Sequence, residues 1–184
     1  MILLGCKPAG RNTEQHDVFV GVGENLKSLV PAINAFWPEA KGKIHIDAWR
    51  EVNYVDEYLI TVEPRHENST LVHEWRLFFI NLGGYKKDMF EEYHHKILVV
   101  ASSLGEVHKN ARNTEFFKTA YVSNSGGASH IDDRYGMDVD DVGEVMEMLP
   151  LEMKNNFSIS ITKSVDSDRV PDEIHIGYLP LSKL

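Results

Sequence analysis

The chain has a single cysteine in 184 residues, Cys6, and this scarcity excludes any internal disulfide. The residues before it, Ile2-Leu3-Leu4-Gly5, are mostly apolar, which favours a packed core thiol over a nucleophile. No apolar run reaches the ~18 residues of a membrane span, and no charged segment followed by a long apolar stretch opens the chain. We therefore expect a protein of the cytoplasm, where thiols stay reduced.

Positive charge is scarce as well. The 19 Lys and Arg are outnumbered by 28 Asp and Glu, and the net charge is −9 with histidine counted as neutral. Without a basic run, the chain lacks the electrostatic footprint of a nucleic-acid-binding protein. Without a basic amphipathic helix, it also lacks the usual means of binding an anionic membrane surface. We expect neither nucleic acid nor a membrane among its partners.

The strong motifs of catalysis are missing too. The chain has no Gly-x-Ser-x-Gly nucleophile elbow and no His-Glu-x-x-His zinc motif. Gly83-Gly84 follows an apolar run, but no further glycine comes at the spacing of a phosphate-binding loop, which favours a tight turn there. These absences favour a protein without catalysis of its own.

What the chain does have is an internal repeat. Leu4-Gly5, followed after eight residues by Glu14-Gln15-His16, recurs as Leu82-Gly83 followed after eight residues by Glu92-Tyr93-His94. A repeat of this kind predicts two copies of one structural unit, each of which is small and gains by packing on its twin. We place the copies at residues 1–65 and 66–184.

A second match supports the same division. His45-Ile46-Asp47 recurs as His130-Ile131-Asp132, and each is followed after eight residues by another aspartate. The offset of this match is larger, and a Ser- and Gly-rich insertion near residues 122–129 accounts for the difference. The repeat therefore brings histidine and aspartate forward in both copies.

The apolar pattern predicts mostly strands, with a helix in each copy. Leu26, Leu29 and Ile33 belong to a helical stripe that contains Pro31, so the helix either begins near Ser28 or is kinked at the proline. Ser103 with Glu106 fits a helix cap in the second copy. Strands are expected over residues 2–6, 17–22, 43–49, 54–62, 75–82, 96–101, 129–132, 157–161 and 173–178. Residues 142–149 fit a helix by spacing and a strand by the repeat, and we favour the strand.

These elements predict an α+β fold. Each copy is expected to be a β-β-α-β-β-like unit, with helices on one face of a mostly antiparallel sheet. The two copies should meet about an approximate twofold axis and share one core.

Four runs of the sequence carry a family resemblance: Gly10 to Asp17, Lys43 to Asp47, Phe79 to Tyr85 and Ile174 to Pro180. On these runs the chain resembles a small bacterial family known as a domain of unknown function, number fifteen forty-three. It implies a bacterial protein in which the domain occurs in two tandem copies. It assigns no activity and no catalytic residue.

The candidate site consists of the repeated histidines and aspartates. Residues two apart on a strand leave the same face, so each His-x-Asp pair can ligate a divalent metal or act as a base with its orienting group. The alternative is a hydrogen-bonded pair that closes a strand end in both copies, and the sequence favours that structural role. The candidates are His16, His45, Asp47, His94, His130 and Asp132.

Two other titratable clusters are interpreted as solvated loops. His94-His95 follow Glu91 and Glu92, but adjacent residues on a strand point to opposite faces, which weakens them as a shared metal site. Asp138, Asp140 and Asp141 lack the glycine and the closing glutamate of a calcium loop in the required register, which favours a turn.

The leading interpretation is a non-catalytic module that binds a small molecule or a protein. The competing interpretation is a metal-assisted hydrolase whose His/Asp site forms between the repeats. No cofactor is expected under the first, and a divalent metal is required under the second. A homodimer is compatible with both. The ligand, the pathway and the oligomeric state are not determined by the sequence.

Overall fold

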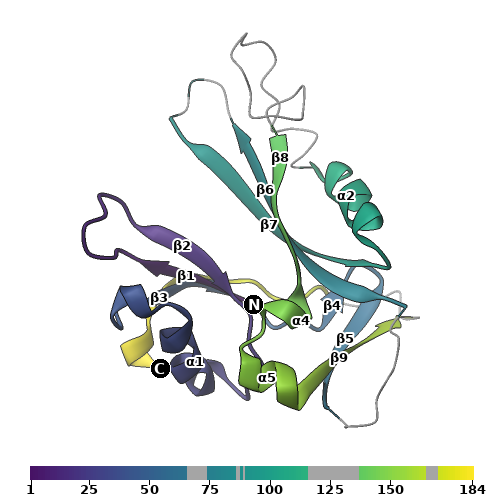
Figure 1. Ribbon diagram of the computed structural model, residues 1–184, viewed down its shortest axis with the longest axis horizontal. Helices are drawn as coiled ribbons and strands as arrows, with labels where there is room; N and C mark the ends of the chain where they lie inside the picture. Colours follow the sequence, from purple (N-terminus) through teal and green to yellow (C-terminus); the bar gives the residue numbers. More distant parts are fainter. Residues whose placement is uncertain (66–73, 86–87, 89, 116–136, 165–169) are drawn as a thin grey trace. The chain divides into compact units, whose positions relative to one another are not determined.

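The computed structural model describes residues 1–65, 74–85, 88, 90–115, 137–164 and 170–184. The chain divides into two compact units (Figure 1). The first comprises residues 1–71 together with 146–184, and the second comprises residues 72–145. The second unit is thus inserted between two segments of the first. The repeat boundaries expected from the sequence stay a prediction.

The first unit is built on a four-stranded antiparallel sheet. Its central strands are β1 (Ile2–Cys6) and β3 (His45–Trp49). β2 (Gln15–Phe19) pairs with the free edge of β1, and β10 (His175–Pro180) pairs with the free edge of β3, in the order β10-β3-β1-β2. The last strand of the chain therefore lies beside a strand from its first third.

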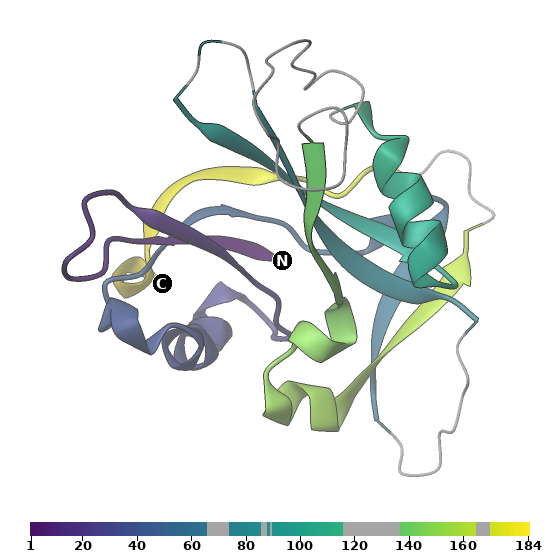
Figure 2. The same ribbon diagram turned by 45° about the horizontal axis from the view of Figure 1, so that its top comes forward.

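Helix α1 (Leu26–Phe36) covers one face of this sheet (Figure 2). Its Leu29 and Ile33 pack in one core with Ile2 and Leu4 of β1, because these strand residues alternate onto the same face. Of the two alternatives for this helix, a start near Ser28 is not observed. Asn25 caps the helix through a reciprocal capping box with Ser28, so the helix begins at Leu26, two residues earlier, and Pro31 lies inside it.

A second sheet of the first unit joins segments that are distant in the sequence. It contains β4 (Tyr54–Val55), β5 (Tyr58–Pro64) and β9 (Phe157–Lys163), in that order. The short helix α5 (Leu151–Asn156) leads directly into β9. The expected strand over 157–161 is confirmed, whereas the segment 54–62, expected to contain one strand, forms β4 and most of β5. The short helix η1 (Pro38–Ala40) follows α1, and η2 (Leu181–Lys183) follows β10.

The second unit repeats the order of strand, strand, helix and strand. Strands β6 (Arg76–Tyr85) and β7 (Glu92–Ala101) form a long antiparallel pair, and β8 (Met137–Glu144) lies on the other side of β6. Helix α2 (Leu104–Arg112) begins at the predicted cap, Ser103. Its buried Val107 and Ala111 pack against the strands of the same unit.

Several local expectations for the second unit are wrong. Gly83-Gly84 is not a turn, because β6 continues through both glycines. The segment of Glu92, His94 and His95 is strand rather than loop, and Asp138, Asp140 and Asp141 lie in β8 rather than in a turn. These strands carry many polar residues, and pairing on β6 outweighs their weak intrinsic strand propensity.

The segment 142–149 is part strand and part helix. β8 ends at Glu144, and α4 (Val145–Met148) follows immediately, so the strand expected from the repeat is wrong beyond Glu144. The apolar spacing of Val145 and Leu149 is helical, and both side chains are buried. The expected strand 129–132 lies outside the described residues.

The architecture is α+β, with three antiparallel sheets and helices that pack on sheet faces. Among the described residues, no helix is long and apolar enough to cross a membrane.

Cys6 gives a direct test of the core of the first unit. The thiol has no exposed surface, and its pKa is raised, first by burial and then by the negative charge of Glu14. A higher pKa leaves less thiolate at neutral pH, so the native chain should react with a disulfide reagent at least ~100-fold more slowly than the urea-unfolded chain. Stopped-flow absorbance measures both rates. Equal rates would show that this core is open.

Candidate functional site

The site is centred on a glycine in the middle of the four-stranded sheet. Gly5 of β1 pairs with His16 of β2 on one side and with His45 of β3 on the other. Residues directly opposite each other in a sheet project from the same face, so both imidazoles emerge beside a position that has no side chain. This is the face opposite to the core, because Leu4 and Cys6 alternate with Gly5 and lie in that core.

A β-bulge adds a carboxylate to the same face. Leu4 pairs with Ile46 and Leu3 with Ala48, so β3 carries one extra residue, Asp47, between two regular pairs. A bulge of this kind turns the side chain of the extra residue and increases the local twist. The bulge therefore brings the carboxylate of Asp47 beside the imidazole of His45.

The edge strand β10 also departs from regular pairing at this point. Ile176 pairs with Ala48 and Leu179 with Ile46, which leaves Gly177 and Tyr178 opposite Asp47. Gly177 has a φ of 149°, in the region that favours glycine. The ring of Tyr178 lies against the ring of His45, with 4.4 Å between the centroids. Tyr178 thus covers the imidazole from the side of β10.

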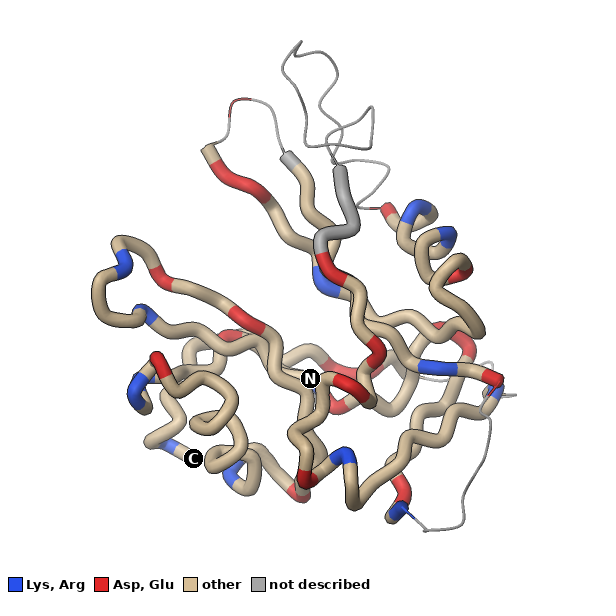
Figure 3. The backbone as a smooth tube through the Cα atoms, viewed as in Figure 1, with Lys and Arg blue, Asp and Glu red and all other residues tan. Residues whose placement is uncertain are grey.

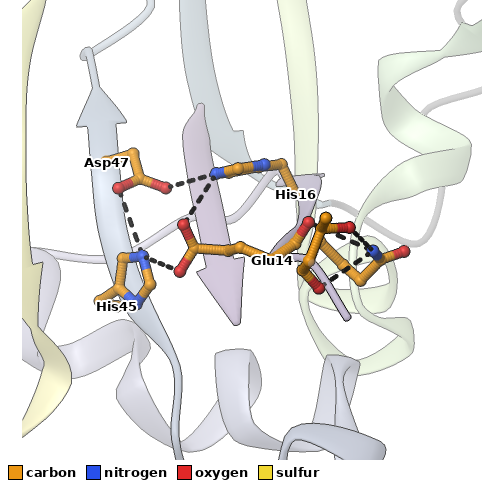
Figure 4. Close-up of polar contacts among 6 residues, drawn as sticks. Glu14, His16, His45 and Asp47 are labelled. Atoms are coloured by element: carbon orange, nitrogen blue, oxygen red, sulfur yellow. Dashed lines mark hydrogen bonds and ion pairs between the residues drawn. The ribbon is translucent and has the colours of Figure 1, made fainter. Parts of the chain in front are cut away.

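Four side chains converge at this place (Figure 4). Nε2 of His45 lies 3.3 Å from Oδ1 of Asp47 and 3.2 Å from Oε1 of Glu14. Nε2 of His16 lies 3.4 Å from Oδ2 of Asp47 and 3.6 Å from Oε2 of Glu14. The two imidazoles and the two carboxylates therefore alternate in a closed ring, which we call the His/carboxylate ring.

The ring is partly buried and poorly hydrogen-bonded. His45 is only 6% exposed, whereas the side chains of His16 and Glu14 are each 44% exposed. Nε2 of His45 and Oδ2 of Asp47 are buried without a hydrogen bond, although both have an oppositely polar atom at ion-pair distance. A buried polar atom left in this condition costs roughly 1–3 kcal/mol. Buried polar groups are normally hydrogen-bonded, so these two atoms call for an explanation, and a bound ion is one.

The backbone is shaped to fit these side chains. A methyl group added at Gly5 would lie 2.5 Å from Oδ2 of Asp47 and closer still to Nε2 of His45. No other residue type has a side chain small enough to leave this space open. Gly5 is therefore part of the site, although it supplies no polar group.

Each imidazole Nε2 lies 3.2–3.6 Å from two carboxylate oxygens, close to the separation of neighbouring ligands around a metal ion. A tetrahedral ion with bonds of about 2.0–2.1 Å separates neighbouring donors by about 3.3 Å. Two imidazole nitrogens and two carboxylate oxygens form a donor set suited to zinc and similar ions. As they stand, however, no three His, Cys, Asp or Glu side chains of the described chain surround one point as metal ligands. Each carboxylate presents a different oxygen to each imidazole, so both carboxylates would have to reorient to bring four donors to one ion.

The structure brings together three of the six predicted candidates, His16, His45 and Asp47. The expected pairing of His45 with Asp47 is present, at the bulge. His94 lies in the second unit, with its Nε2 3.9 Å from Oε2 of Glu92. His130 and Asp132 lie outside the described residues, so the convergence of the two His-x-Asp pairs stays a prediction.

Sequence reasoning missed Glu14 and Gly5 as site residues. Glu14 reaches both imidazoles, although only the histidines and aspartates of the repeat were candidates. A signal was present, since Glu14 and His16 are two apart at the start of a strand and recur as Glu92 and His94. Gly5 also recurs, as Gly83.

Comparison with known proteins gives a family match and a fold match. Residues 11–62 match the family model described as Domain of Unknown Function (DUF1543), in one copy. This segment includes Glu14, His16, His45 and Asp47, while Gly5 precedes it. No curated protein matches the chain.

A solved structure extends the similarity in fold to nearly the whole chain. It is described as the crystal structure of a protein Il1583 from Idiomarina loihiensis. The two chains are 23% identical, with a TM-score of 0.63, and the similarity covers 98% of this chain and 94% of that one. At this identity the similarity shows a shared fold and no shared activity.

Proposed function

We propose that the first unit binds a divalent transition-metal ion through Glu14, His16, His45 and Asp47, without a reaction of its own. The observation that carries the proposal is the buried Nε2 of His45, which faces two carboxylates and makes no hydrogen bond. An ion at the centre of the His/carboxylate ring would satisfy this atom and neutralise both carboxylates. The sequence predicts a module that binds a small molecule or a protein, and this proposal identifies the ligand as a metal ion.

The donor set supports binding rather than hydrolysis. A catalytic zinc site uses three protein ligands and keeps a fourth position for water or substrate, whereas a structural site is closed by four. The ring offers four side chains at similar spacings, from 3.2 to 3.6 Å. The competing metal-assisted hydrolase would require one of them to leave the ion. His16 and Glu14 are the half-exposed candidates for that step.

The same proposal treats the two sheets as tandem copies of one ancestral unit. Each has a central strand flanked by two antiparallel partners, and a helix precedes the third strand in both. Gly5 and Gly83 occupy the same place, since His16 pairs with the first and His94 with the second. We also propose that the protein lies in the bacterial cytoplasm, where its single cysteine stays reduced.

A zinc titration of the purified full-length chain tests the proposal. Calorimetry in competition with a chelator should detect one tight site, and the double variant His16→Ala/His45→Ala should bind zinc at least ~100-fold more weakly, because two of four ligands are lost. The matched control is His108→Ala, an exposed histidine of α2 in the second unit, which should leave this site unchanged. Equal zinc affinity in the wild type and the double variant would refute the proposal.

The hydrolase alternative has a separate readout. Zinc- or manganese-loaded protein would have to turn over a simple phosphoester or ester substrate, and the double variant would have to lose that turnover. We expect no turnover above the rate of the metal ion alone.

A further inference from the structure

Strand pairing assigns a counterpart of the His/carboxylate ring to the second unit. Gly83 of β6 pairs with His94 of β7 and with Asp138 of β8. In the first unit, Gly5 of β1 pairs in the same way with His16 of β2 and with His45 of β3. The register therefore places Asp138, and not His130, at the position of His45.

The irregularity in pairing is repeated as well. Leu82 pairs with Val139 and Asn81 with Asp141, so β8 carries one extra residue, Asp140, between two regular pairs. In the first unit the extra residue of β3 is Asp47, which lies between the pairs made by Leu4 and Leu3. A bulge within a strand is a specific feature that is retained in related sheets. Asp140 thus holds the register position of Asp47.

The fourth position is occupied by Glu92. It lies two residues before His94, as Glu14 lies two residues before His16, and it pairs with Tyr85 at the same distance along the strand from the central glycine. The carboxylate of Glu92 has turned toward the imidazole of His94, with Oε2 3.9 Å from Nε2. The side chains of His94 and Glu92 are 35% and 38% exposed, so both are accessible to an ion.

We infer that the second unit holds a second divalent-cation site at the register positions of Glu92, His94, Asp138 and Asp140, around Gly83. The inference extends the proposed function of the first unit to a site of different composition. Figure 3 shows acidic residues on β7 and on the end of β8 that leads into α4. The position opposite the central glycine is occupied by His45 in the first unit and by Asp138 in the second.

This exchange changes the ion that the second site should select. The first site has two imidazoles and two carboxylates, whereas the second has one imidazole and three carboxylates. Imidazole favours zinc, copper and nickel, while carboxylates favour manganese, magnesium and calcium. The second site should therefore prefer manganese, and the first should prefer zinc.

Manganese binding to the full-length chain tests the second site separately from the first. The electron paramagnetic resonance signal of free Mn²⁺ falls when the ion binds, so it gives both stoichiometry and affinity. In the His16→Ala/His45→Ala background, we expect one manganese ion to bind with unchanged affinity. In the same background, Asp138→Asn/Asp140→Asn should weaken binding at least ~10-fold and His94→Gln several-fold, since each removes ligands of the ion.

The control is Glu144→Gln. It removes a carboxylate from the same strand, but from a residue that forms an ion pair with Arg76. It should leave manganese binding unchanged. Manganese binding that is absent in the His16→Ala/His45→Ala background, or is insensitive to Asp138, Asp140 and His94, would overturn the inference. If only the proposal for the first site is wrong, the wild type will show no tight zinc binding, while manganese binding will still depend on Asp138, Asp140 and His94. The two results are independent.

Discussion

Gly5→Ala should abolish zinc binding by the first unit, with an affinity at least ~100-fold lower than that of the wild type. The added methyl group would lie 2.5 Å from Oδ2 of Asp47 and closer to Nε2 of His45, so both ligands would have to move. β1 cannot retreat, because it is held between β2 and β3. The same crowding should lower the free energy of unfolding by about 1–3 kcal/mol. Zinc titration and urea unfolding measure the two effects.

The control for this substitution is Gly105→Ala. Gly105 lies in α2, and a methyl group there would meet nothing within 4 Å. Alanine is a better helix former than glycine by up to about 1 kcal/mol, so this variant should be as stable as the wild type or more stable, with zinc affinity unchanged. If Gly5→Ala kept zinc affinity within a few-fold of the wild type, the His/carboxylate ring would not be the binding site.

Phe19→Ala should cause a large loss of stability, about 3–5 kcal/mol in the free energy of unfolding of the first unit. Phe19 is 1% exposed at the end of β2 and belongs to the same core as Leu29 and Ile33 of α1. Its removal leaves a cavity between the sheet and the helix that the surrounding side chains can fill only in part. Trp37 and Trp49 pack against this core, so tryptophan fluorescence during urea unfolding reports the change.

Phe36→Ala is the matched control for Phe19→Ala. The two rings are edge-to-face partners with centroids 5.5 Å apart, but Phe36 is 40% exposed. Removing it deletes the ring contact and little buried area, so the loss should be about 1 kcal/mol. Equal losses for the two variants would mean that Phe19 is not packed as described.

The sequence predicted those parts of the fold that depend on local pattern. The apolar stripe through Leu29 and Ile33 marked α1, and Ser103 marked the start of α2. Alternation marked the strand that begins at Phe157. These features succeed because the periods of 3.6 and 2 are set by backbone geometry alone. The α+β class follows from them.

The site could be predicted only in part, because it depends on strand pairing. The spacing of His45 and Asp47 placed both on one face of a strand, and the repeat pointed to His16. The repeat alignment nevertheless chose His130 as the partner of His45, on sequence identity. Pairing with β6 places Asp138 opposite Gly83. Register is set by strand pairing, which sequence identity alone does not reveal.

The return of β10 to the side of β3 also sets the order in which the chain can fold. The second unit is one continuous segment, residues 72–145, whereas the first needs residues 146–184 to complete both of its sheets. During synthesis from the N-terminus, the inner segment is therefore complete before the outer one. Tyr178 reaches His45 only across this long loop, and long-range closure of that kind is slow. The contact of Tyr178 with His45 is thus among the last contacts of the first unit to form.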